Sequence, residues 1–205
     1  MEQSSVMRTR LLAIYDDVER RARVTSDTHP WWPCRRGCDT CCRRLADVPQ
    51  LVRAEWELLE EGLAALAPEV RAVIVARITA LDTPERPRHV TCPMLDEQEG
   101  ACLVYAHRPG ACRTYGFYVE RELGLHCSLV TDAVAQHEAH DAEKEVSEPV
   151  VWGNQSGVDY ALARLAEDAA TPLPLTAWLR SSTSCSAEGP LEPPRPLPSS
   201  PSSSM

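Results

Sequence analysis

Apolar residues recur at helical spacing along three stretches of the first half of the chain. Between residue 5 and about residue 24 they fall on one stripe, with most charged residues off it, which predicts an amphipathic helix. A second helix is predicted after Pro49, and a third starts at Pro68, because proline suits the first position of a helix. The apolar positions of the three stretches are Met7, Leu11, Ile14, Tyr15, Val18 and Ala22; Val52, Trp56, Leu59, Leu63 and Leu66; and Val70, Ile74, Ile78 and Leu81.

The second half of the chain predicts further helices near residues 129–143 and 157–169. The segment 173–179 is the last piece expected to be ordered, with Trp178 docked on the core. Few runs alternate apolar and polar residues, so strand signals are poor. The predicted fold class is therefore mainly α: a small helical domain with long cysteine-bearing loops. Loops of such length need a stabiliser, so we expect them to be organised around a metal or iron–sulfur centre.

The composition divides the 205 residues into a domain and a tail. Residues 1–180 are predicted to form one cysteine-cluster metal-binding domain. Of the 25 residues in 181–205, nine are serine and six are proline. Such a segment buries too little apolar surface to offset its chain entropy, so we expect a disordered tail that could attach a protein partner.

The charge and hydropathy of the chain narrow its possible partners. A formal net charge of −9 argues against a general binder of nucleic acid or anionic membranes. The sequence contains no run of about eighteen apolar residues, so no segment is predicted to span a membrane. The first residues do not resemble a secretory signal, so a cytoplasmic location is expected. Nine cysteines in a cytoplasmic protein indicate metal binding or redox chemistry more than disulfides.

Eight of the cysteines lie between residues 34 and 127, in two groups along the sequence. Thiolates bind a metal when they converge at about 2.3 Å from it, and the close spacing of the first group suits this. Adjacent cysteines generally point apart, so Cys41 and Cys42 either serve different metals or one faces the core. Cys185, in the tail, is not expected to be a ligand. The predicted metal ligands are Cys34, Cys38, Cys41 and Cys42, spaced C-x3-C-x2-C-C, and Cys92, Cys102, Cys112 and Cys127.

Arginines gather around these cysteines although the chain as a whole is acidic. The first loop carries four arginines and one acidic residue, Asp39, a local net charge of +3. Four thiolates around Zn²⁺ or a [4Fe–4S]²⁺ core leave a charge near −2, which guanidinium groups would stabilise. The alternative is a solvated basic loop. The arginines are Arg35, Arg36, Arg43 and Arg44 in the first loop, and Arg88, Arg108 and Arg113 beside the second group.

The motifs together resemble a known family. They are Trp32-Pro33-Cys34, Cys38-x-x-Cys41-Cys42, Cys92-Pro93-Met94-Leu95, Cys102-Leu103-Val104-Tyr105, and Arg108-Pro109-Gly110-Ala111-Cys112-Arg113-Thr114-Tyr115. Over roughly residues 30–130 the chain is similar to the YkgJ-type cysteine-cluster family of zinc- or iron-chelating domains. One extra residue separates Cys34 from Cys38, compared with the usual C-x2-C-x2-C-C pattern. The resemblance implies metal or iron–sulfur binding, and a flagellin lysine methylase has a similar cysteine region.

The identity of the metal and its use stay open at this stage. Zinc and iron–sulfur clusters both accept all-thiolate sites, and eight ligands could hold one centre or two. The long, irregular loops favour an iron–sulfur cluster over a zinc ribbon. The predicted function is a metal-binding protein with a redox or metal-handling role. The alternatives are a structural zinc module that mediates protein interaction, or a cluster-dependent methyl- or electron-transfer enzyme. His126 could add a ligand, whereas His137 and His140 are better explained as a surface pair.

Overall fold

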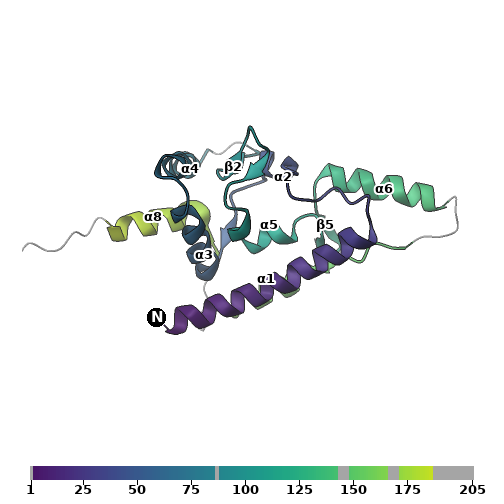
Figure 1. The fold of residues 1–205 in the computed structure, drawn as a ribbon, viewed down its shortest axis with the longest axis horizontal. Helices are drawn as coiled ribbons and strands as arrows, with labels where there is room; N and C mark the ends of the chain where they lie inside the picture. Colours follow the sequence, from purple (N-terminus) through teal and green to yellow (C-terminus); the bar gives the residue numbers. More distant parts are fainter. Residues whose placement is uncertain (1, 86–87, 143–147, 166–170, 187–205) are drawn as a thin grey trace, which may run out of the picture.

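The computed structural model describes residues 2–85, 88–142, 148–165 and 171–186. In Figure 1, α1 lies along one side of the molecule, α3, α4 and α8 gather at one end, and α6 lies at the other. The helices are α1 Glu2–Thr28, α2 Thr40–Arg43, α3 Arg53–Ala64, α4 Pro68–Ala80, the 3₁₀ helix η1 Tyr105–His107, α5 Gly110–Thr114, α6 Ser128–Ala142, α7 Gln155–Ala163 and α8 Leu175–Ser186. The strands are β1 Gln50–Leu51, β2 Leu95–Asp96, β3 Ala101–Cys102, β4 Tyr118–Glu120, β5 Leu123–Leu125, β6 Gly153–Asn154 and β7 Leu173–Pro174.

The mainly α class predicted from the sequence is confirmed, and short strands join the long loops. In the described residues, β1 pairs with β7, β2 pairs with β3, and β4 lies between β5 and β6. Strands of two or three residues are too short to show the alternation that predicts a strand, which explains why the sequence did not indicate them. The helix predicted at 157–169 ends at Ala163, and residues 166–170 lie outside the described part.

The boundary predicted at residue 180 falls inside a helix. α8 continues to Ser186, because the first residues of the predicted tail contain no proline and the next proline is Pro190. Residues 187–205 lie outside the described part of the chain. The docking of Trp178 is confirmed: it packs against the buried core, and its Nε1 donates a hydrogen bond to the carbonyl of Leu51 at 2.8 Å.

Two clusters of buried apolar residues support the cysteine loops. The first joins α3, α4 and α8 and includes Cys92, with Cys42 and Cys102 packed against it. The second joins α1, α3 and α7. Since α3 contributes to both clusters, the helices on either side of the cysteines share one framework. The clusters contain Leu51, Trp56, Leu59, Leu63, Ile74, Ile78 and Leu95, and Leu11, Tyr15, Val18, Leu58, Tyr118, Val158 and Leu162, respectively.

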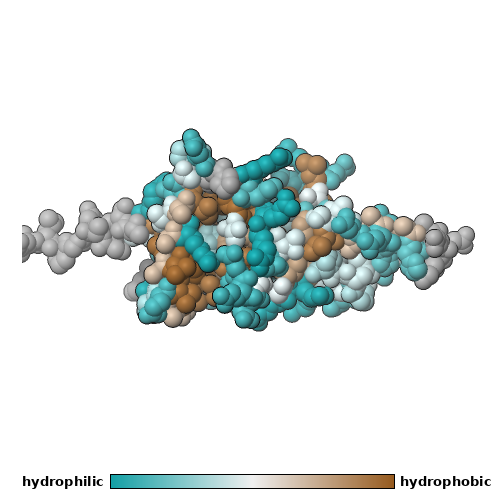
Figure 2. Space-filling view, turned by 90° about the horizontal axis from the view of Figure 1, so that it is seen from above, coloured by the Kyte–Doolittle hydropathy of each residue, from teal (hydrophilic) through white to brown (hydrophobic). Residues whose placement is uncertain are grey.

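The surface is mostly hydrophilic on the face shown in Figure 2, with apolar side chains gathered toward the end that carries α4 and α8. On α4, the side chains of Val70 and Val73 are exposed. No helix in the described part of the chain combines the length and the apolar character that a membrane crossing requires.

Candidate metal centre

The eight predicted ligands line two neighbouring cavities, and this arrangement differs from their order in the sequence. Each of the eight is a free thiol. A cavity of about 300 Å³ is lined by Cys34, Cys38, Cys41, Cys112 and Cys127. A second cavity, of about 420 Å³, is lined by Cys38, Cys41, Cys42, Cys92, Cys102 and Cys112. Three of the thiols therefore lie between the two cavities.

The thiols fall into two sets according to which of them affect one another's pKa values. Burial, followed by the proximity of Cys38, Cys127 and Cys41, raises the pKa of Cys34 to about 12. We call these four residues the first set: Cys34, Cys38, Cys41 and Cys127. The first set draws Cys127 from the second sequence group and omits Cys42, which a grouping by sequence spacing alone did not predict.

The remaining four thiols form the second set: Cys42, Cys92, Cys102 and Cys112. A hydrogen bond from Cys41 lowers the pKa of Cys42, but contact with Cys92 and burial raise it to about 12 overall. Burial, together with nearby Cys42 and Cys102, raises the pKa of Cys112 to about 12. Burial also raises the pKa of Cys102. The raised pKa values of Cys42 and Cys112 keep these two thiols neutral near pH 7 when no metal is bound.

The short helix α2 places two adjacent cysteines at the point where the two sets meet. Cys41 and Cys42 are successive residues of this one-turn helix, and side chains on a helix diverge by about 100° per residue. Cys41 therefore contributes to the first set and Cys42 to the second. The hydrogen bond with Cys42, followed by burial, raises the pKa of Cys41 and shows that the two sets adjoin at this point.

Turns position the other members of the first set. Cys38 follows a turn in which its N–H donates to the carbonyl of Arg35 at 3.0 Å, and Gly37 has a φ of +92°. Cys127 precedes α6, and its carbonyl accepts from the N–H of Val130 at 3.1 Å. Gly116, with a φ of +91°, approaches Cys34 so closely that a Cβ there would overlap Cys34 Sγ. Both the positive φ and the close approach to Cys34 Sγ therefore favour a glycine at position 116.

Backbone pairing brings the second set together. The N–H of Cys92 donates to the carbonyl of Cys42 at 2.7 Å, and an antiparallel bridge between Leu45 and Val90 continues this contact. Cys102 lies on β3, opposite Leu95 of β2. Because Cys92 is buried in the first apolar cluster and Cys42 and Cys102 pack against it, the second set borders the core of the fold.

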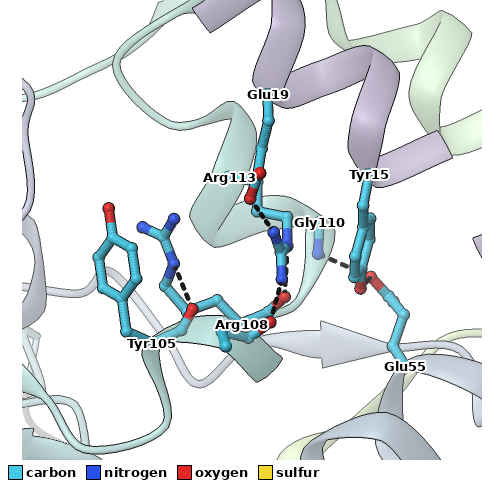
Figure 3. Close-up of polar contacts among 8 residues, drawn as sticks. Tyr15, Glu19, Glu55, Tyr105, Arg108, Gly110 and Arg113 are labelled. Atoms are coloured by element: carbon cyan, nitrogen blue, oxygen red, sulfur yellow. Dashed lines mark hydrogen bonds and ion pairs between the residues drawn. The ribbon is translucent and has the colours of Figure 1, made fainter. Parts of the chain in front are cut away.

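Cys112 lies on α5, which is held by a buried polar network. Glu55 accepts hydrogen bonds from the Tyr15 hydroxyl at 2.9 Å, from the N–H of Gly110 at 2.8 Å and from the N–H of Val52 at 3.0 Å. Figure 3 shows the first two of these contacts, which tie α1 and α3 to the start of α5. Burial raises the pKa of Glu55. Glu55 was not predicted to have a role, because two of its three partners, Tyr15 and Gly110, lie 40 and 55 residues away in the chain.

Arginines stand beside both sets, as their clustering in the sequence predicts. Arg113 is buried, forms an ion pair with Glu19, and donates to the carbonyls of Arg108 at 2.8 Å and Ala106 at 2.6 Å. The guanidinium carbon of Arg108 lies 3.6 Å from the centroid of the Tyr105 ring. Arg35, Arg36, Arg44 and Arg108 line the second cavity, whereas Arg43 pairs with Asp39 at 2.6 Å.

The histidines named from the sequence, His126, His137 and His140, do not line the cysteine cavities. His126 stacks on Trp152 with ring centroids 5.1 Å apart, and its Nδ1 is 3.2 Å from Thr131 Oγ1. His137 packs on Trp31 with centroids 4.4 Å apart. Neither lines a cysteine cavity, whereas His89, which the sequence analysis overlooked, lines the second one. The side chain of Cys185 lies outside the described part of the chain.

The donor set fits zinc or iron, because both metals accept four thiolates. As the side chains stand, no three His, Cys, Asp or Glu residues of the described ranges are arranged as ligands of one ion. Three of the thiols line both cavities, so the sets are defined by which thiols influence one another's pKa values. A larger cavity of about 710 Å³ lies between α1 and α7, but no cysteine lines it.

These features define a mostly helical cysteine-cluster protein. Residues 33–145, more than half of the chain, match the sequence profile of the CxxCxxCC family, described as "Putative zinc- or iron-chelating domain". The chain belongs to this family, as the resemblance of its motifs predicted. No curated protein and no solved structure matches the chain.

Proposed function

We propose that the eight cysteines hold two metal centres, the first bound by the first set and the second by the second set. The observation that carries this proposal is the division of Cys41 and Cys42 between two groups of thiols, each completed by residues from both ends of the cysteine region. The chelating description of the family supports the same role. Thiolates are the metal-binding form, so each centre forms as four thiols lose their protons.

We favour iron–sulfur clusters over single zinc ions. A zinc ion draws its ligands to about 2.3 Å and needs little room. The cavities that the thiols line have volumes of about 300 and 420 Å³, which suits a polynuclear cluster better. The arginines beside them would stabilise the negative charge that a four-thiolate cluster retains.

The two centres would serve different purposes. Cys92 lies in the first apolar cluster and Cys42 and Cys102 pack against it, so the second centre would act mainly as a structural link between α2, β3 and α5. The first set faces a cavity lined by residues of α1 and by arginines, which leaves room for a reaction partner. A redox or metal-handling role would therefore belong to the first centre.

A structural zinc module is the second candidate, favoured by the burial of Cys92 in the core. Under this alternative both centres are zinc, the chain unfolds on chelation, and it has no redox activity. Reversible reduction of the purified protein would favour the redox role.

Anaerobic purification with iron, sulfide and zinc analysis tests the proposal. We expect absorbance near about 400 nm and sulfide equivalent to iron, as clusters of this kind contain both. Cys34→Ser is expected to remove one centre, and Cys185→Ser, which changes a thiol outside both sets, is expected to retain both. A colourless protein with stoichiometric zinc and no sulfide would contradict the iron–sulfur assignment. Full metal content in Cys34→Ser would contradict the ligand assignment.

A further inference from the structure

The cavity beside the first set is lined by more positively charged side chains than negatively charged ones. Its walls include four arginines and one acidic residue, Glu19, which is already paired with Arg113. The other three arginines come from α1, from the first cysteine loop and from the turn before α5: Arg23, Arg35 and Arg108. Within the described ranges, these three form no ion pair.

Arg108 is fixed in one orientation. Its Nε donates to the carbonyl of Tyr105 at 3.0 Å, and its face lies over the Tyr105 ring at 3.6 Å. Arg113 anchors the adjoining backbone through the carbonyls of Arg108 and Ala106. Figure 3 shows the two terminal amino groups of Arg108 on the side away from the bond to Tyr105.

Those two amino groups donate to no described residue, so the outer edge of the guanidinium stays open toward the cavity that it lines. A planar guanidinium with a fixed position and a free edge matches the geometry of a carboxylate or phosphate group. Little side-chain entropy is lost on binding, because the arginine is already held.

The metal centre alone does not account for all of this charge. A centre of four thiolates and Zn²⁺, or of four thiolates and a [4Fe–4S]²⁺ core, carries a charge of about −2. Arg35 and Arg108 also line the second cavity, so the balance is taken over both cavities and both centres. The arginines that line them and form no ion pair in the described ranges are Arg23, Arg35, Arg36, Arg44 and Arg108. Their charge of +5 exceeds the charge of about −4 that two such centres carry. The volume of about 300 Å³ is at the lower end of the range of small-molecule sites.

We infer that this cavity binds a small oxyanion through Arg108, assisted by Arg23 and Arg35, directly beside the first set. The recognised group is a phosphate or a carboxylate. This inference rests on the proposed function and extends it, because it gives the first centre an anionic substrate or effector.

Titration calorimetry on the metal-loaded protein, at constant ionic strength and in a buffer free of competing anions, tests the inference. Inorganic phosphate and succinate are the two probes, and the tighter one identifies the group that the site prefers. Arg108→Gln removes the bidentate donor and is expected to weaken binding about tenfold or more. Arg71→Gln, a change at an exposed arginine of α4, is the matched control and should leave the affinity unchanged.

Arg23→Gln provides a second variant, because Arg23 is exposed on α1 and its loss does not disturb the core. It should weaken binding about two- to fivefold and reduce the dependence of affinity on salt. The inference is overturned if neither anion binds to protein that carries its full metal content. It is also overturned if the Arg108→Gln or Arg23→Gln variant binds as tightly as Arg71→Gln. Metal analysis of the same samples reports separately on the proposed function.

Discussion

Gly116 offers a way to disturb one set of thiols without touching a sulfur atom. The substitution Gly116→Ala adds a single methyl group, which would overlap Cys34 Sγ in the present structure. Gly37 has nearly the same backbone conformation, with a φ of +92° against +91° for Gly116. An added Cβ at Gly37 meets nothing within 4 Å. Gly37→Ala is therefore a matched control for the backbone strain alone.

The two substitutions should cause the same backbone strain but differ in their effect on metal binding. A residue with a side chain costs about 1–2 kcal/mol in a left-handed conformation, so each variant should lose about that much stability. In a chain of this length, this corresponds to a fall in Tm of about 2–8 °C. Metal binding by thiolates contributes about 10 kcal/mol or more, so strain alone leaves the first centre bound in Gly37→Ala. In Gly116→Ala the added methyl group also displaces Cys34 Sγ, so we expect the first metal centre to be lost.

Metal analysis and thermal unfolding of the two variants test this reasoning. Gly116→Ala is expected to lose about half of its metal, because only the first set contains Cys34. Gly37→Ala is expected to retain all of it with a lowered Tm. Equal metal content in both variants would refute the assignment of Gly116 as the residue that makes room for Cys34.

Four further predictions concern buried hydrogen bonds and the protons of the thiols. Glu55→Ala removes the acceptor of three buried hydrogen bonds and should lower the free energy of unfolding in urea by about 3 kcal/mol or more. Burial raises the pKa of Glu55, so its protonated form stabilises the fold below the ordinary carboxyl pKa, and this contribution is lost as the pH rises through the folded value. The stability of the natural chain relative to Glu55→Gln should therefore be greater near about pH 4 than at about pH 7, and the opposite trend would contradict it. The pKa values of Cys34, Cys42 and Cys112 are raised to about 12, so zinc binding near neutral pH should release about four protons per centre. Calorimetry in buffers of different ionisation enthalpy measures this release. Release of fewer than two protons per centre would contradict neutral thiols. Trp178→Phe removes the hydrogen bond to the Leu51 carbonyl and should cost about 1 kcal/mol in urea unfolding, while no change would show that α8 does not stabilise the domain.

The helices could be predicted from the sequence because their apolar stripes are long and regular. The stripes of α1, α3 and α4 span several turns each, and Pro68 marks the start of α4. The small sheets could not be predicted, since strands of two or three residues carry no readable alternation. No helix was predicted at α8: the serine-rich composition from residue 181 was taken as a sign of disorder, whereas the helix runs from Leu175 to Ser186.

The cysteines could be recognised as a cluster, but their division into sets could not. The sequence predicted that Cys41 and Cys42 point apart, but the two side chains are hydrogen-bonded to each other on α2, where the two sets adjoin. It did not indicate that Cys127 joins Cys34, because that contact depends on the turn at Gly116 and on the position of α6. Spacing along the chain reports neighbours in sequence, whereas ligand sets depend on the way the loops pack.

We propose that the ligand sets follow the fold and not the order of the cysteines. Two double variants test it most directly, through metal content per chain after anaerobic purification. Cys34→Ser with Cys127→Ser changes one set, and we expect half of the metal to remain. Cys34→Ser with Cys42→Ser changes both sets, and we expect almost none to remain. If the first pair loses all of the metal and the second pair only half, the cysteines are grouped by sequence and the account is wrong.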